Sequence, residues 1–526
     1  MSCFAFRRRI VSFLIMSYVQ SVTRGGEPEP RSHQSAGPGS VAPRHVATAA
    51  AVAFVGGLAM FLVAPAFMQL QADSFRDLYL GRWIVEHGFP LREVFAIANR
   101  GGRWVDQQWL SDAIAYGTWK LAGYQGLALV NAGAFAVAYA MLAGLMRWRG
   151  ASVALAVSFA SFAMVSAFTL VFIRAQMLVL PLFVALLWLC LDDAAHDDLR
   201  WRTVLLVPLL VLWANMHGSA LLGTAIATAY LLYRSGRMAR LHQRRSASLY
   251  AGLSAVAGLT VIATPFGFGV LHYYTAFVGN TAIGAADLEW NSPAFPRLGF
   301  FQFVVPLALA CASAIYARAK GHRVSLLVTG AMVLTAVAAS LAMRNNVWLG
   351  IAAALLLAES AASWIPTQPY SIRFLRVLAT AGAILAVVGV GRLTGESSAR
   401  FEVLAPKSAL RGTAAYARTH PCSLVLADIL SVSALLWHDP WLAGRVAFDG
   451  RIEIYRPQAL LRWVDFQSAD GPRSLDVARG YGILIASSRS PRLARELSGL
   501  RGATVLGRDS HGVSVLTRHP PGCSPW

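Results

Sequence analysis

The sequence predicts an α-helical polytopic membrane protein with about eleven spans and a small C-terminal α/β domain. Two features of composition predict this class: 56% of the 526 residues are hydrophobic and only 14% are charged, whereas soluble domains are about one quarter charged. The third feature is clustering, because stretches such as residues 46–70 and 126–146 are long enough to cross a hydrocarbon core of about 30 Å. The apolar residues are therefore expected to meet lipid.

Hydropathy places the spans one after another from residue 46 onward, with short polar loops between most of them. The predicted spans are residues 46–71, 124–146, 151–172, 176–191, 203–215, 217–233, 249–264, 300–317, 324–342, 347–363 and 375–392. The resulting domains are a disordered basic cytoplasmic tail (1–45), a transmembrane domain (46–392) with a long first outer loop (72–123), and a soluble α/β domain (393–526). The Trp-rich first outer loop is expected to form helices that lie in the membrane interface.

Basic residues give the orientation, because Lys and Arg are concentrated in cytoplasmic loops. The short loops that carry them all fall on one side in this scheme: Arg147 and Arg149, residues 234–245, residues 318–323, and Arg373 with Arg376. The N-terminus is then cytoplasmic and the C-terminal domain extracytoplasmic, as in a multi-pass protein of the bacterial inner membrane. The net charge of +20 thus reflects topology, and no nucleic-acid partner is expected.

Residues 204–233 are too long for a single span, and both of their flanks are predicted to be cytoplasmic. We expect a re-entrant pair of short helices, with a turn at Asn215, His217 and Gly218 near the outer face. The alternative is one strongly tilted helix that contains a satisfied interior His.

Polar residues at the membrane edge converge on the predicted outer side, which favours an outward-facing polar cavity between helices. They are Asp73, Asp77, Arg174, Gln176, Asn215, His217, Asp287, Glu289, Arg344 and Asn345. In the C-terminal domain, Asp449, Arg451, Glu453 and Tyr455 form a second cluster, which is either a lid over this cavity or a solvated turn and strand held by its own Arg–Glu pair. Cys422 and Cys523 also lie in that domain, where an oxidising compartment permits a disulfide; the sequence leaves their distance open.

The order and spacing of several motifs resemble bacterial polytopic proteins related to the GT-C glycosyltransferases. The resemblance covers most of the chain after the tail. It is carried by residues 73–109, Arg174-Ala-Gln176, Trp213-x-Asn215-x-His217-Gly218, Glu289-Trp-x-Ser-Pro293, Arg344-Asn345 and Phe448-Asp449-Gly-Arg451-x-Glu453-x-Tyr455. One departure is Asp77, where similar proteins carry a His.

The resemblance implies transfer of a sugar from a polyprenyl-phosphate donor to a glycan, lipid or protein acceptor at the outer face. The catalytic carboxylate of the first outer loop then falls on Asp73, which suits a general base that takes the acceptor's hydroxyl proton. Arg174, His217 and Arg344 suit the departing phosphate. Oxygen ligands from Asp73 and Asp77 also fit Mg²⁺ or Mn²⁺, although two acids at this spacing equally form a polar helix face.

Two other functions fit the same sequence. A flippase for lipid-linked glycans also needs an apolar groove and phosphate-binding arginines, but transporters usually show internal repeats and polar sites near the midplane. This chain shows no internal repeat, and its polar residues lie at one edge. The third function is a non-catalytic membrane scaffold whose outer domain binds a partner.

Overall fold

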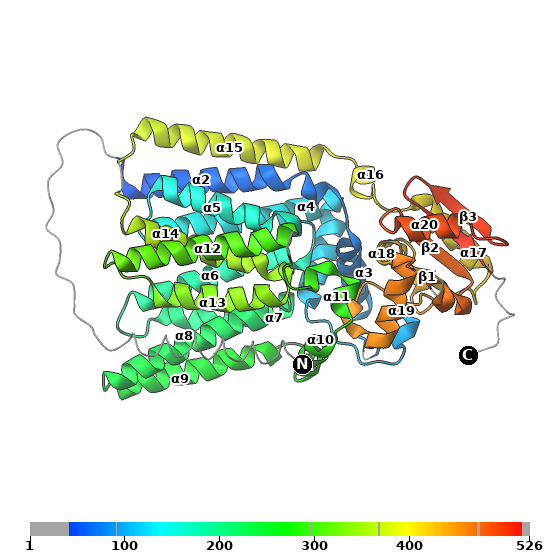
Figure 1. Cartoon of the computed structure of the whole chain (residues 1–526), viewed down its shortest axis with the longest axis horizontal. Helices are drawn as coiled ribbons and strands as arrows, with labels where there is room; N and C mark the ends of the chain where they lie inside the picture. Colours follow the sequence, from blue (N-terminus) through cyan, green and yellow to red (C-terminus); the bar gives the residue numbers. More distant parts are fainter. Residues whose placement is uncertain (1–41, 91, 295–296, 367–368, 471–473, 518–526) are drawn as a thin grey trace. The chain divides into compact units, whose positions relative to one another are not determined.

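The computed structural model describes residues 42–90, 92–294, 297–366, 369–470 and 474–517 (Figure 1). This part of the chain is mostly helical, and seven of its helical segments are long and apolar enough to cross a membrane. They are α2 (Arg44–Val63), α4 (Trp109–Trp148), α6 (Ala175–Ala194), α9 with its 3-10 extension (Arg244–Ile262), α12 (Leu298–Ala319), α14 with its 3-10 start (Met343–Ala362) and α15 (Ile372–Gly395).

Four further helices occupy the remaining predicted spans. They are α5 (Val153–Ala167), α7 (Leu206–Met216), α8 (Ala220–Arg240) and α13 (Leu326–Leu341). Every predicted span therefore contains a helix, although the number that cross the bilayer stays a prediction. The tail at residues 1–41 lies outside the described residues.

The first outer loop contains α3 (Ala72–His87) and the start of α4. A kink divides α4 at Ala122 and Gly123, where Gly123 has a φ of 63°, in the left-handed region that only glycine adopts at little cost. This kink coincides with the predicted start of the span at residue 124. The loop therefore ends in a helical segment that precedes the spanning part of the same helix.

The apolar stretch 204–233 is broken into two helices, so the interpretation as one tilted helix is wrong. Helix α7 ends at Met216, His217 is extended, and α8 begins at Ala220. A Cβ on Gly223 of α8 would meet the ring of Trp213 at 2.6 Å, so the two helices pack too closely for a larger residue there. That the pair is re-entrant stays a prediction.

Helix α14 is the centre of the bundle, since nearly every side chain from Asn346 to Ala361 is buried. It packs against α5, α12 and α13, as expected of a helix that is apolar on all sides. At the edge, α2 and α15 run side by side (Figure 1). Their backbones approach so closely that a Cβ on Gly57 would lie 1.9 Å from the carbonyl oxygen of Gly382.

The C-terminal α/β region contains a four-stranded sheet of order β1-β2-β4-β3. β1 pairs in parallel with β2, and β4 is antiparallel to both β2 and β3. Its elements are α16 (Ser398–Phe401), α17 (Lys407–Thr419), β1 (Val425–Ala427), α18 (Ile429–His438), α19 (Pro457–Ser468), β2 (Ile483–Ser487), α20 (Pro491–Ser498), β3 (Thr504–Asp509) and β4 (Gly512–Leu516). The small α/β fold is as predicted, although α15 continues to Gly395, beyond the predicted boundary at 392.

The α/β region packs on the first outer loop. Helix α18 contacts α3, and the strand-like segment at Ala96 pairs in parallel with Val446. Arg82 donates to the carbonyl oxygen of Trp437 at 2.7 Å and its guanidinium lies 3.9 Å from the centroid of the same indole ring. The loop and the α/β region thus form a continuous surface at one end of the helices.

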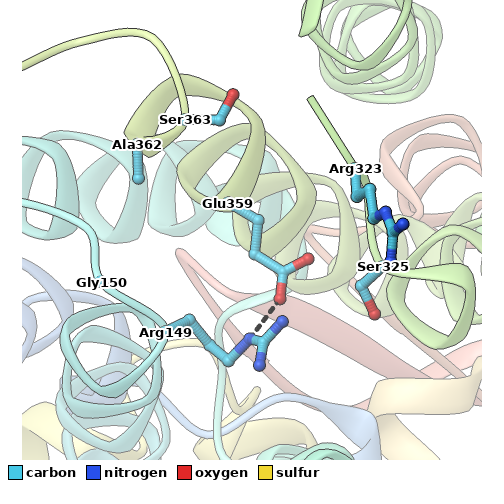
Figure 2. A pocket seen from close by; sticks show the side chains of 7 residues that line it. All are labelled: Arg149, Gly150, Arg323, Ser325, Glu359, Ala362 and Ser363. Atoms are coloured by element: carbon cyan, nitrogen blue, oxygen red, sulfur yellow. Dashed lines mark hydrogen bonds and ion pairs between the residues drawn. The ribbon is translucent and has the colours of Figure 1, made fainter. Parts of the chain in front are cut away.

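Basic residues meet at the other end of α4. Arg44 donates to the carbonyl oxygen of Arg147, and Arg149 pairs with Glu359 at the end of α14. Arg323 lines a cavity together with Arg149 (Figure 2). Several of the basic loops on which the predicted orientation depends thus lie together, while the side of the membrane that they face stays a prediction. Among the cysteines, Cys190 and Cys311 are free, whereas Cys523 of the predicted disulfide with Cys422 lies outside the described residues.

Candidate functional site

The first turn of α3 positions Asp73. A capping box begins this helix, in which Gln71 and Ser74 exchange hydrogen bonds between side chain and backbone. The Ser74 hydroxyl also donates to the carbonyl oxygen of Ile173 at 2.6 Å, which fixes the start of α3 against the segment before α6. A carboxylate in the first helical turn is further stabilised by the helix dipole.

Asp73 lies between two guanidinium groups. Its Oδ1 is 3.0 Å from Arg76, one turn later on α3, and its Oδ2 is 3.9 Å from Arg174. Burial raises the pKa of Asp73, but the positive charges of Arg76, Arg174 and Arg344 outweigh it and hold the pKa below its usual range. The carboxylate is therefore ionised at neutral pH. It also stays 26% exposed, which leaves it accessible to a small ligand.

Arg174 stands at the N-terminal end of α6 and is almost fully buried. One terminal nitrogen pairs with Glu289 at 2.7 Å and the other donates to the carbonyl oxygen of Leu170 at 3.0 Å. Its Nε is buried without a hydrogen-bond partner among the described residues. Arg174 consequently links the carboxylates of Asp73 and Glu289 while one of its donors stays unused.

Glu289 and Arg344 come from neighbouring loops. Asp287 caps the short 3-10 helix Leu288–Trp290 by accepting from the Glu289 amide at 2.9 Å. Burial and the nearby Glu289 charge raise the pKa of Asp287 to about 6. The Arg344 guanidinium stacks over Trp290, 4.0 Å from the ring centroid. Gln176 donates to the Arg344 carbonyl oxygen at 3.1 Å and thereby connects this loop to α6.

Asp77 is buried beside this cluster, and its oxygens are already occupied. It accepts from the amide of Ala175 at the start of α6 (3.1 Å), from Gln108 (3.0 Å) and from Arg76 (3.0 Å). Burial raises its pKa to about 6 against the charge of Arg76, and the like charge of Asp73 adds to the rise. Asp77 thus joins α3, α6 and the end of the first outer loop.

The carboxylates of Asp73 and Asp77, the possible metal ligands, are both paired with arginine, and a metal between them stays a prediction. Both carboxylates face the same guanidinium of Arg76. Within the described residues, no group of three or more Asp, Glu, His or Cys side chains is arranged to hold a metal ion. A shared arginine already supplies the positive charge that a metal would bring.

Asn215 and His217 lie at the break between α7 and α8. Asn215 accepts from the indole of Trp109 at 2.8 Å and donates to the carbonyl oxygens of Val211 and Ala263. His217 Nδ1 is 2.8 Å from the hydroxyl of Ser219. Every polar atom of the Asn215 side chain is thus used to join α4, α7 and the end of α9.

The second cluster is a closed, buried network. Arg451 Nε donates to Asp449 at 2.9 Å, and an Arg451 terminal nitrogen donates to Glu93 of the first outer loop at 2.7 Å. Tyr455 donates to Asp449 at 2.8 Å. Because Asp449, Arg451 and Tyr455 are all buried, the interpretation as a solvated turn and strand is wrong. Residues Ile452–Ile454 form a 3-10 helix, and the arginine pairs with Glu93 instead of Glu453.

This buried network also places the α/β region over α3. A Cβ on Gly450 would lie 2.9 Å from the Ser433 hydroxyl and 3.4 Å from the Cβ of Arg76, so glycine allows the close approach. Burial raises the pKa of Glu453, while the nearby Arg76 charge acts in the opposite direction. The segment thus lies close to Arg76, while its role as a lid over the cavity stays a prediction.

Arg76, Gln108 and Glu93 were not among the residues predicted for the site. Arg76 was detectable, since its spacing from Asp73 is that of an intrahelical ion pair. Glu93 was not detectable, because its partner is 358 residues away in the sequence.

Comparison with known proteins identifies no function for this site. No family model matches the chain, and a search of curated proteins found no match. Function therefore has to be inferred from the chemistry of the Asp73 cluster.

Proposed function

We propose that this chain is a membrane glycosyltransferase that uses a polyprenyl-phosphate sugar, with Asp73 as the general base. One observation carries the proposal: a partly exposed carboxylate lies beside two arginines at the junction of the helices, the first outer loop and the α/β region. A base next to cations suits a reaction in which a hydroxyl loses a proton while a phosphate departs.

The transfer step uses these groups in one sequence. Asp73 takes the proton of the acceptor hydroxyl, the acceptor oxygen bonds to the anomeric carbon, and the bond from that carbon to the phosphate oxygen breaks. The phosphate leaves with the electron pair, and the anomeric configuration inverts. Arg174 and Arg344 act as the cations that stabilise the departing phosphate.

The electrostatics support this division of roles. In the free site, the arginine charges hold the pKa of Asp73 below its usual range, which makes it a weak base. A phosphate bound to Arg174 and Arg344 would neutralise part of that charge and raise the pKa of Asp73. Asp73 then becomes a stronger base only when the donor is bound.

The proposed setting is the bacterial inner membrane, with the α/β region on the extracytoplasmic side. The donor would enter from the bilayer, and the acceptor would be a glycan, lipid or protein on the same side. The basic loops near Arg149 and Arg323 support this orientation, since they gather at the opposite end of α4.

Sugar transfer in proteoliposomes tests the proposal. The full chain is reconstituted with a panel of labelled polyprenyl-phosphate sugars and membrane-glycan acceptors, and covalent incorporation is measured. Asp73→Asn keeps the side-chain size but removes the base, and Asp476→Asn, at an exposed site in the α/β region, is the matched control. We expect transfer by the wild type and the control but not by Asp73→Asn.

Two other outcomes would each replace the proposal. Movement of labelled donor between the leaflets without covalent transfer would identify a flippase. Binding of donor with neither movement nor transfer across the whole panel would identify a scaffold.

A further inference from the structure

Two buried acids near the start of α4 have no part in the proposed reaction. Asp106 lies in the segment before α4 and is 4% exposed, whereas Asp112, in the first turn of the helix, is fully buried. Their carboxyl groups are hydrogen-bonded to each other. We call these two residues the aspartate pair. Two buried carboxylates in contact repel each other strongly, so the contact itself carries information about protons.

Gln108 occupies the other oxygens of the aspartate pair. Its backbone amide donates to Oδ1 of Asp106 at 3.1 Å, and its side-chain amide donates to Oδ1 of Asp112 at 3.1 Å. Oδ2 of each aspartate is buried and receives no hydrogen bond from any other group within the described residues. The contact between the two acids therefore falls to these two oxygens.

A hydrogen bond between two carboxyl groups requires a proton on one of them, because ionised carboxylates only accept. Burial raises the pKa of Asp106. Burial also raises the pKa of Asp112 well above its usual range, and the like charges of Asp106 and Asp77 add to this rise. The electrostatics therefore agree with the geometry.

The charges that face the aspartate pair do not replace this proton. Arg76 of α3 and Arg451 of the α/β region favour ionisation, whereas Asp77 of α3 opposes it. Each arginine is already paired with two other carboxylates. Tyr273 of α10 also faces Asp106, and burial raises its pKa well above the usual range, so its hydroxyl stays neutral. Positive charge thus reaches the pair only from a distance.

We propose that the aspartate pair holds one shared proton at neutral pH and forms a proton-dependent latch between the segment before α4 and the first turn of that helix. Gln108 extends the latch to α3, because its side-chain amide also donates to Asp77 at 3.0 Å. Loss of the proton leaves two carboxylates in contact and opens the latch. The proposal does not depend on the glycosyltransferase function.

Infrared difference spectroscopy of the full chain at neutral pH tests the shared proton. Asn has the size of Asp and donates to a remaining carboxylate, so Asp106→Asn and Asp112→Asn each keep one negative charge and one hydrogen bond. We expect each variant to lose the band of one protonated carboxyl relative to the wild type. Asp476→Asn, at an exposed position, should lose none.

Two spectroscopic outcomes would overturn the proposal. If neither variant loses the band, the pair is fully ionised at neutral pH. If the band persists in Asp106→Asn, Asp112 is neutral by itself and no proton is shared.

Stability gives a second measure. Above the ordinary pKa of 3.8, the folded wild type keeps a proton that the unfolded chain has released. Its unfolding equilibrium constant, relative to that of Asp112→Asn, should therefore rise about tenfold per pH unit as the pH is raised from about 5 to about 7. The same pH dependence in both proteins would contradict the shared proton.

Hydrogen exchange of the wild type tests the latch without any variant. As the pH is raised above neutral, peptides that cover residues 103–112 should lose protection, corrected for the intrinsic exchange rate, before peptides of α14 do. Protection of residues 103–112 that persists until the whole chain unfolds would overturn the latch. This measurement decides the question even if the Asn variants do not fold.

Discussion

Asp73 and Asp193 are both aspartates paired with arginine, near opposite ends of α6, but their surroundings differ. Asp193 is fully buried, and both of its oxygens are saturated: Thr203 and Tyr250 donate to Oδ1, while Tyr230, Tyr250 and Arg234 contact Oδ2. Asp73 is partly exposed and shares its arginines with other acids. A network that closes on itself stabilises the fold, whereas one with an accessible oxygen and shared cations is available to a ligand.

The largest expected effect is the loss of transfer activity when Asp73 is replaced. Asp73 and its arginines are called the open network below, and Asp193 with its partners the closed network. Asp73→Asn should reduce sugar transfer by roughly 10²–10⁴-fold, the usual contribution of a general base. Its free energy of unfolding should change by less than about 1 kcal/mol, because the ion pair is partly solvated. Thermal unfolding in detergent, measured beside the transfer assay, separates the two. A large loss of stability would show that Asp73, like Asp193, mainly stabilises the fold.

In the closed network around Asp193, a substitution should mainly lower the stability of the protein. Asp193→Ala leaves Arg234 buried without its counter-ion and should lower the free energy of unfolding by about 3–5 kcal/mol. The neighbouring Asp192 pairs only loosely with a half-exposed Arg202, at 3.8 Å, so Asp192→Ala should cost less than about 1 kcal/mol. Thermal unfolding of both variants measures the difference. Equal losses would remove the contrast between the two networks.

Asp77 combines the two situations, because it is buried yet lies beside the open network. Burial raises its folded pKa to about 6, above its ordinary value of 3.8. Between these pH values the folded protein keeps a proton that the unfolded chain has released. The raised pKa therefore stabilises the folded protein fully below pH 3.8, the ordinary pKa. This contribution to the free energy of unfolding, roughly 3 kcal/mol at most, is lost as the pH rises to about 6.

The Asp77→Asn variant removes this titration. The stability of the wild type should fall relative to the variant as pH is raised from about 4 to about 7. Thermal unfolding across that range measures it, and Asp476→Asn is the control, whose curve should run parallel to that of the wild type. If the Asp77→Asn curve is also parallel, the buried carboxyl does not titrate as described.

The smallest effect concerns the contact between the α/β region and the first outer loop. Glu93→Gln keeps an acceptor for the amides of Phe95 and Ala96 but weakens the charged bond to Arg451. The free energy of unfolding should fall by roughly 1–2 kcal/mol. Glu86→Gln alters an exposed acid on α3 that accepts from Tyr116, and should cost less than about 0.5 kcal/mol. No difference between them would mean that Arg451 relies on Asp449 alone.

Local features of this fold were predictable from sequence, whereas the partners of charged groups were not. The break at His217 and the start of the spanning part of α4 after Gly123 follow from residue type within a few positions. The gathering of Asp73, Arg174 and Glu289 follows from placing the ends of the spans on one side. The hydrogen bond that the Ala175 amide donates to Asp77 depends on helix rotation and packing, which hydropathy does not contain.

The close contact between Gly57 and Gly382 has a consequence for biogenesis. Helix α2 is made early, but the helix that covers its glycine face, α15, is synthesised more than 300 residues later. Until the ribosome has passed Gly395, Gly57 of α2 cannot make its contact with Gly382 of α15. Packing of α2 is therefore completed late in synthesis, and a truncated chain that ends before α15 would leave α2 without this partner.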